Sequence, residues 1–260
     1  MHILISNDDG IYAPGVRVLA NTLYEAGYTV TVVCPDRERS ATGHALTMHK
    51  PLRVEAAVPG FYAEGLTAWA VSGTPSDAVK LGLDALITER PDLIISGINR
   101  GANLGSDVLY SGTVSAAMEG AMEGLPSIAV SLASYEIADY QPAADFIARF
   151  VAALERDPLQ EPFLLNINVP ALPTAEIAGV RIARLGIRRY RDQFQKRFDP
   201  RGNVYYWLAG IVIEGEEAPD SDVAALKEAC IAITPLKYNL TYEPAFVPLT
   251  ERNFEKLLTN

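Results

Sequence analysis

Cysteine is scarce in this chain of 260 residues, which contains only Cys34 and Cys230. The two thiols lie far apart and form no C-x-x-C motif, so a disulfide framework is not expected. Each lies in an apolar run, which predicts reduced, buried thiols and a cytoplasmic protein. Long apolar runs are also missing, and no basic segment followed by an apolar one opens the sequence. We therefore expect neither a membrane span nor a signal peptide.

Basic residues are fewer than acidic ones. The chain contains 22 Lys and Arg residues and 32 Asp and Glu residues, which gives a formal net charge of -10. This balance argues against a nucleic-acid polymer or an anionic membrane as partner, since both require a basic surface. A small phosphorylated substrate stays compatible, because a bound divalent cation can reverse the local sign of charge. The hydrophobic content of 49% is ordinary for a soluble globular protein, and 260 residues suffice for one large α/β domain or for a core domain with an appended arm.

The glycine-rich G-x-G-x-x-G turn of dinucleotide-binding proteins is absent after the first predicted strand. Residues 2–6 form a short apolar run, residues 14–26 an amphipathic helical pattern and residues 28–34 a second apolar run rich in Thr and Val. This spacing predicts a right-handed parallel β-α-β unit. Asp36 would occupy the position of a ribose-binding acid, but without the glycine turn a dinucleotide site is not predicted.

An acid pair, Asp8 and Asp9, follows the first predicted strand directly, and Gly10 permits a turn there. Ligands in open α/β sheets bind at the carboxyl ends of the strands. Two carboxylates at this edge favour Mg²⁺, Mn²⁺ or Ca²⁺ over zinc, because no Cys or His lies beside them. The alternative is that both acids only cap the helix beginning near Pro14.

Further polar loops are predicted to leave the same edge of the sheet. Residues 37–50 form a loop with Ser40, Gly43 and His44, and residues 97–105 form a loop rich in Gly and Asn after the predicted strand 92–96. Residues 110–113 then open a helix, whose N-terminal N–H groups suit an anion, although capping alone would also explain them. His44 is a candidate general acid or phosphate contact, because histidine titrates near neutral pH.

The remaining chain divides into two parts. Residues 74–88 predict a helix capped by Thr74, and strands at 126–132 and 163–169 flank a helix at 142–155. Beyond Pro170 the regular alternation ends, and residues 204–208, a helix start at 220–223 and a strand at 230–235 follow. This tail is either an arm that packs on a second subunit or an ordinary C-terminal subdomain.

Short motifs in this order resemble the SurE family of 5'-nucleotidases, also called survival proteins, over nearly the whole chain. They are residues 5–10 (ISNDDG), 35–40 (PDRERS), 73–75 (GTP), 96–99 (SGIN), 103–105 (NLG), 110–114 (YSGTV), 116–120 (AAMEG) and 233–236 (ITPL). Each motif alone is weak, but the common order is specific. One departure is Ala229-Cys230-Ile231-Ala232, where the family usually has a glycine before Ile233.

The resemblance implies a metal-dependent phosphomonoesterase acting on nucleoside 5'-monophosphates, with 3'-monophosphates as a further substrate class. It implies a Rossmann-like three-layer core with a mostly parallel sheet at residues 1–185 and a β-rich arm at residues 186–260 that joins homodimers or homotetramers. One divalent metal ion per subunit, Mg²⁺ or Mn²⁺ with Ca²⁺ as an alternative, would be held by Asp8, Asp9, Ser40 and Asn99. The family's phosphate and substrate contacts would be Asn7, Gly43, Asn103, Ser111, Gly112 and Thr113. To these we add His44, on the ground of its residue type and its place in the second polar loop.

Two other functions stay open at this point. A phosphatase with an aspartyl nucleophile would place its acids at i and i+2, whereas Asp8 and Asp9 are adjacent. A nucleotide-binding regulatory protein without turnover would use the same loops only to sense its ligand. Whether water or Asp8 attacks phosphorus is also open, although two acids on one metal ion favour water.

Overall fold

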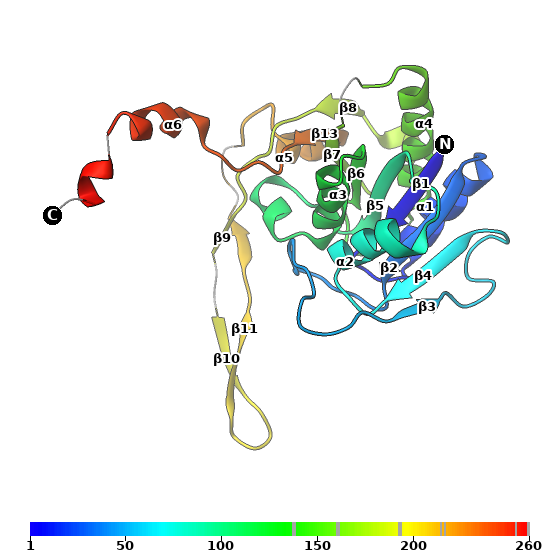
Figure 1. Ribbon diagram of the computed structural model, residues 1–260, viewed down its shortest axis with the longest axis horizontal. Coiled ribbons are helices and arrows are strands. Elements are labelled where there is room, and N and C mark those ends of the chain that lie inside the picture. The colour runs from blue at the N-terminus through cyan, green and yellow to red at the C-terminus, as the bar shows by residue number, and fades with distance from the viewer. Residues whose placement is uncertain are drawn as a thin grey trace.

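The computed structural model describes residues 1–136, 139–159, 162–191, 194–213, 215, 217–252 and 254–258. A nine-stranded sheet with helices on both faces forms its centre (Figure 1). In chain order its strands are β1 (His2–Ser6), β2 (Thr29–Pro35), β3 (Val54–Ala56), β4 (Thr67–Val71), β5 (Leu93–Arg100), β6 (Ser127–Leu132), β7 (Leu164–Val169), β8 (Gly179–Ile182) and β13 (Cys230–Leu236).

The strand order is β3-β4-β2-β1-β5-β6-β7-β13-β8. Six consecutive strands from β4 to β7 are parallel, while β3 pairs antiparallel with β4 and β13 pairs antiparallel with β7. In the sheet, β2 lies on one side of β1 and β5 lies on the other. The strand order therefore reverses direction at β1. This is the Rossmann-like arrangement that the sequence predicted, and its switch point lies where β1 ends.

Helices cover both faces of the sheet. They are α1 (Pro14–Glu25), α2 (Pro75–Leu81), α3 (Gly112–Met122), α4 (Gln141–Arg156), α5 (Asp222–Lys227) and α6 (Glu243–Thr250), with short turns η1 (Gly82–Leu86), η2 (Gly105–Leu109), η3 (Thr174–Glu176) and η4 (Phe254–Leu258). α1 and α4 pack together in one hydrophobic cluster with the sheet, and α2 and α3 pack on the other face. In the described part of the chain, no helix is long and apolar enough to span a membrane.

Local sequence explains the helices that carry the site. The predicted apolar face of α1, which consists of Val16, Leu19, Ala20 and Leu23, is fully buried. The predicted cap of α2 is also confirmed: the Thr74 hydroxyl accepts a hydrogen bond from the Asp77 N–H, and the Asp77 carboxylate accepts one from the Thr74 N–H. The start of α2 is therefore fixed by residues within one turn.

Two predicted boundaries differ in the structure. The helix expected to reach about residue 88 ends as an α-helix at Leu81 and continues as one π-helical turn, η1. The strand expected to end at Ser96 continues to Arg100, because β5 shifts its register against β6 between Ser96 and Asn99 and then pairs again. Part of the predicted polar loop is thus strand.

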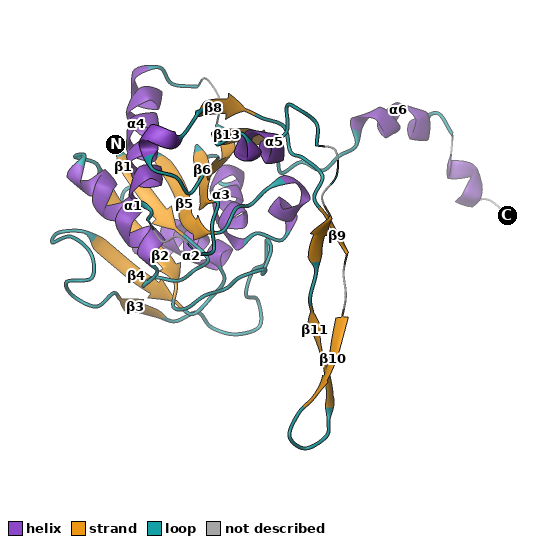
Figure 2. Cartoon of the chain, turned by 180° about the vertical axis from the view of Figure 1, so that it is seen from behind, coloured by secondary structure: helices purple, strands orange, loops and turns teal. Residues whose placement is uncertain are grey.

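The segment after residue 185 is not a single unit. It begins with a thin antiparallel arm made of β9 (Arg189–Arg191), β10 (Phe194–Phe198), β11 (Val204–Leu208) and β12 (Ile211–Ile213), which protrudes from the core (Figure 2). The chain then returns, and β13 lies between β7 and β8 in the central sheet. After β13, α6 and η4 extend away from the core with their apolar side chains exposed (Figure 1).

We predict that Gly15→Ala destabilises the fold, because a Cβ atom there would lie 2.0 Å from the Ile98 carbonyl oxygen of β5. α1 would have to move away from the sheet, and we expect the free energy of unfolding to fall by about 2–4 kcal/mol. Urea denaturation measures this. Gly179→Ala is the control, since a Cβ atom there meets nothing within 4 Å. An equal loss in both variants would rule out the contact with Ile98 as the cause.

Candidate functional site

The Asp8 side chain lies at the end of β1, against the start of α3. It is 5% exposed, and its Oδ1 atom accepts a hydrogen bond of 2.5 Å from the Thr113 hydroxyl. A Cβ atom on Gly112 would lie 2.7 Å from the Asp8 Cβ atom, so only glycine allows this approach. Asp8, Gly112 and Thr113, which the sequence placed in one site, are thus in direct contact.

Asp9 turns toward the neighbouring strand, where its Oδ2 atom accepts a hydrogen bond of 3.1 Å from the Arg100 N–H. Burial raises the pKa of both carboxyls, and that of Asp8 reaches about 6. The nearby Glu38 carboxylate raises both pKa values further, and the Asp9 carboxylate also raises that of Asp8. Negative charge is therefore concentrated in a place where water is partly excluded.

The capping alternative for the acid pair is not what the structure shows. The N-cap residue of α1 is Ala13, and no side chain caps this helix. The turn after β1 is held instead by Asn7, whose side-chain amide exchanges hydrogen bonds with the Gly10 backbone at 2.9 and 3.1 Å. The Asn7 side chain, predicted to contact phosphate, is buried and shapes the loop that presents Asp8 and Asp9.

The loop at residues 37–50 contacts the backbone of the acid pair. The Arg39 N–H donates to the Asp8 carbonyl oxygen at 2.7 Å, which brings the exposed Ser40 next to the pair. The Ser40 hydroxyl donates to Glu38 Oε1 at 2.7 Å. Farther along, the Gly43 N–H donates to the Tyr110 carbonyl oxygen at 3.1 Å, so this loop also contacts the turn before α3.

His44 contacts a buried carboxylate on α3. Its Nε2 atom lies 2.6 Å from Oε2 of Glu119, which is 3% exposed and also receives the Lys80 ammonium at 3.2 Å. Glu119 lies seven residues beyond Gly112 on α3, or about 10 Å along the helix axis. The hydrogen bond from His44 lowers the pKa of Glu119. In this geometry His44 anchors the loop to α3.

Asn99 and Asn103 lie in different surroundings. Asn99 is half-buried at the end of β5 and donates its amide to the Gly101 carbonyl oxygen at 2.7 Å, which leaves Oδ1 as its acceptor. Asn103 is buried, donates its amide to the Ser131 hydroxyl at 2.8 Å, and accepts bonds on its carbonyl oxygen from Asn166 and Asn168. Asn103 therefore ties its loop to β6 and β7.

The N-terminus of α3 completes the site. The Ser111 hydroxyl caps the helix by accepting a hydrogen bond of 3.1 Å from the Val114 N–H. The N–H groups of Gly112 and Thr113 belong to the first helical turn, which has no intrahelical acceptors for them. These N–H groups and the helix dipole favour a bound anion beside Asp8.

The predicted metal ligands are brought together only in part. Asp8 and Asp9 share one loop, and Ser40 follows Arg39, whose N–H is bonded to the Asp8 carbonyl oxygen. Asn99 directly precedes Arg100, whose N–H donates a hydrogen bond to the Asp9 carboxylate. The described residues contain no cluster of three or more His, Cys, Asp or Glu side chains suited to a metal ion. The oxygen donors fit a hard cation, which would offset the burial and the neighbouring carboxylate charge that raise the pKa of Asp8.

Sequence patterns gave no role to Glu38 and Glu119, which both belong to the site's surroundings. Glu38 lies within the predicted polar loop, so its proximity to the acid pair could have been read from that loop. Glu119 contacts His44 across 75 positions of sequence, and no local pattern announces such a pair.

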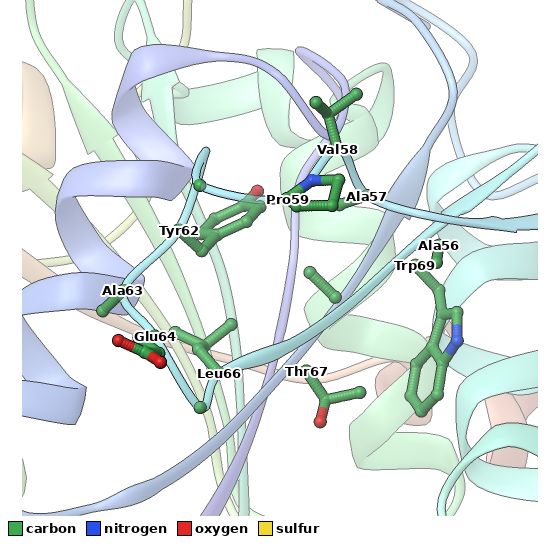
Figure 3. A pocket seen from close by; sticks show the side chains of 13 residues that line it. Ala56, Ala57, Val58, Pro59, Tyr62, Ala63, Glu64, Leu66, Thr67 and Trp69 are labelled. Carbon is green, nitrogen blue, oxygen red and sulfur yellow. The ribbon is translucent and has the colours of Figure 1, made fainter.

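A cavity of about 510 Å³ lies elsewhere, under the loop between β3 and β4 (Figure 3). Val58, Pro59, Tyr62, Leu66 and Trp69 give it mainly apolar walls. It includes none of the predicted site residues. The chemistry-bearing residues therefore do not line this cavity.

We predict that Asp8→Asn stabilises the metal-free protein above pH 6. Between its ordinary pKa of 3.8 and about 6, folded Asp8 binds more protons than unfolded Asp8, so stability falls as the pH rises through this window. Removing the charge should raise the free energy of unfolding at pH 7.5 by about 1–3 kcal/mol, and by less at pH 4.5. Urea denaturation with a chelator measures this. The exposed Asp84→Asn is the control, and a gain independent of pH would contradict the argument.

Comparison with known proteins identifies the family of this chain. The family described as Survival protein SurE matches residues 3–192. A Gloeobacter violaceus protein named 5'-nucleotidase SurE is 74% identical, covering 99% of this chain and 97% of its own, and a Thermosynechococcus vestitus protein of the same name is 59% identical, covering 96% of each. The crystal structure of SurE protein from Aquifex aeolicus superposes with a TM-score of 0.82 at 34% identity, covering 96% of this chain and 99% of that one. The chain belongs to the SurE family.

Proposed function

We propose that this protein is a metal-dependent 5'-nucleotidase, which hydrolyses nucleoside 5'-monophosphates to nucleosides and phosphate. The related proteins from Gloeobacter violaceus and Thermosynechococcus vestitus carry this activity in their names. Hydrolysis of 3'-monophosphates is part of the proposal as a second substrate class. The observation that carries it is the contact of a buried carboxylate, Asp8, with the N-terminus of α3.

This contact suits phosphoryl transfer because it joins two kinds of group. The N–H groups of Gly112 and Thr113 can receive phosphoryl oxygens, and the Ser111 hydroxyl keeps that helix start in place. Beside them, Asp8 and Asp9 can hold a cation that faces the same phosphate. An anion site and a cation site at one strand end are what a phosphomonoester requires.

A divalent cation would be held by Asp8, Asp9, Asn99 and Ser40, the last after its hydroxyl leaves Glu38. When bound, Mg²⁺ or Mn²⁺ would supply Lewis-acid polarisation of the phosphoryl group. Asn7 holds the loop rigid, and Asn103 holds the neighbouring loop. We take water as the nucleophile, because the Asp8 carboxylate is fixed by Thr113 and packs against Gly112.

His44 and Gly43 serve this site through the loop that they anchor. The Gly43 N–H is bonded to Tyr110, immediately before the phosphate-binding turn, and His44 is bonded to Glu119 farther along α3. The loop is thus held at one point just before α3 and at a second point on α3. We propose that His44 fixes the loop that carries Ser40, and not that it transfers a proton.

We predict that the protein releases phosphate from AMP with Mg²⁺ or Mn²⁺, and that a chelator abolishes the release. Asp8→Asn and Asp9→Asn should each lower kcat/KM by about a hundredfold or more, because each removes one of two charges that hold the cation. Asp84→Asn is the matched control. Unchanged rates in both site variants at low metal concentration would move the metal site elsewhere, and nucleotide binding without any phosphate release would favour a regulatory protein.

We also propose that the protein is at least a homodimer, with a tetramer as the larger alternative, and that its arm forms part of the contact. The arm and tail expose many large apolar side chains to solvent in the single chain, more than a free segment can stably expose. They are Phe194, Phe198, Tyr206, Trp207, Leu208, Leu240, Tyr242, Phe246, Leu257 and Leu258.

We predict a mass of at least two chains by light scattering at micromolar concentration. Trp207→Ser should lower the apparent association constant by about tenfold or more, because tryptophan side chains contribute strongly to interfaces. The control is Tyr135→Ser, which changes an exposed aromatic residue outside the arm. Trp69→Ser would be unsuitable, because Trp69 lies in the central sheet. A monomer mass for the wild-type protein would mean that the arm belongs to an ordinary subdomain.

A further inference from the structure

We propose that the root of the arm, residues 186–191, positions the phosphate-binding turn at Ser111–Thr113 through η2. Asp107 on η2 and Tyr190 on β9 are the positioning residues, and the buried Asp222 supports them. They touch neither substrate nor metal ion in this proposal. The proposal rests on the nucleotidase function above, because it assigns the turn to phosphate binding.

The first observation is a set of contacts between the arm root and η2. The Tyr190 hydroxyl donates a hydrogen bond of 2.5 Å to Oδ2 of Asp107, and the Arg188 guanidinium lies 3.4 Å from the same oxygen. The Ser106 hydroxyl donates to the Arg188 carbonyl oxygen at 3.0 Å. Three contacts therefore join two residues of η2 to two residues of the arm root.

A buried carboxylate adds a second connection. Asp222, at the start of α5, is 0% exposed and accepts hydrogen bonds of 2.8 Å from the N–H groups of Gly105 and Gly186. Gly105 opens η2 and Gly186 opens the arm root, so one side chain holds both segments. A Cβ atom on Gly105 would lie 2.5 Å from the Gly186 carbonyl oxygen, so the two backbones touch. Such charge-assisted bonds, buried from water, hold their partners firmly.

η2 leads directly into the phosphate-binding turn. The Tyr110 N–H donates to the Asp107 carbonyl oxygen at 3.0 Å, and Ser111, the N-cap of α3, follows. Three peptide bonds therefore separate Asp107 from Tyr110, which is also bonded to Gly43, and a fourth leads to Ser111. Any movement of η2 will shift the N–H groups of Gly112 and Thr113 relative to Asp8.

The arm root has few other attachments to the body of the protein. β9 pairs only with β12 among the described strands, and this pair is separate from the central sheet. Figure 2 shows the pair continuing outward into the β10–β11 hairpin, away from the core. The contacts with η2 thus join the site to the segment that we propose to contact a second subunit, and the position of the arm becomes part of the geometry of the site.

The test compares Tyr190→Phe with Tyr206→Phe. Each variant removes one tyrosine hydroxyl from the same arm. Tyr190 binds Asp107, whereas the structure gives the exposed Tyr206 hydroxyl no partner within the described residues. We expect Tyr190→Phe to raise KM for AMP about fivefold while kcat changes by less than about twofold, because a shifted turn loses phosphate binding shared by ground and transition states. Tyr206→Phe should match the wild-type protein, and both variants should keep the wild-type mass in light scattering.

Amide hydrogen exchange gives a readout that does not depend on catalysis. In Tyr190→Phe, the amides of residues 106–115 should exchange about tenfold faster, as expected for the loss of one bond to a carboxylate. Those of β1 and α4 should not change. If wild-type protein releases no phosphate from AMP, the nucleotidase proposal fails, while this exchange experiment still tests the connection between arm and turn.

A double-mutant cycle with Asp107→Asn identifies the contact itself. If Tyr190 acts through Asp107, the double variant should raise KM no more than the larger single effect. Additive effects would overturn the proposal. Exchange and KM values in Tyr190→Phe equal to those in Tyr206→Phe would overturn it as well, and so would a KM change that appears only together with a fall in oligomeric mass.

Discussion

The site depends on one unfavourable burial, that of the Asp8 carboxylate against the start of α3. Burial raises its pKa to about 6, and the acids beside it add repulsion. The fold holds this charge in place with a hydroxyl, from Thr113, and with a glycine, Gly112, that lets the helix approach. A buried charge that lacks a counter-ion weakens a fold, but it also makes a strong cation site. The stability lost at Asp8 and the cation affinity that we propose for this site would therefore have the same physical origin.

The sheet supplies the rigidity that such a burial requires. β1 lies between β2 and β5 with its apolar residues fully buried, so the loop carrying Asp8 and Asp9 leaves a fixed strand. α1 is pressed against β5 at Gly15, which sets the direction in which that loop must turn. The remaining partners come from loops after β2, β5 and η2. Each loop is tied down by its own bonds, as with Gly43 and Asn103, before any ligand is present.

The sequence predicted the parts of the fold that depend on local patterns. The buried strands, the apolar face of α1 and the cap of α2 follow from residues within a few positions of each other. The prediction was wrong about the end of the strand at Ser96, because the continuation to Arg100 depends on pairing with β6. Likewise, nothing near Cys230 shows that β13 would enter the central sheet beside β7, since that contact spans a long stretch of chain.

The same distinction explains which site residues were predictable. The acid pair and the start of α3 are visible as motifs, but their contact joins positions 105 residues apart, so its geometry comes only from the tertiary structure. His44 was a reasonable candidate for proton transfer by residue type. In the structure, however, the His44 ring is hydrogen-bonded to Glu119 on α3. Residue type tells what a side chain can do, whereas packing decides what it faces. Because η2 is held from the arm side by Asp222 and Tyr190, the site's geometry includes a segment that no motif connects to the acid pair.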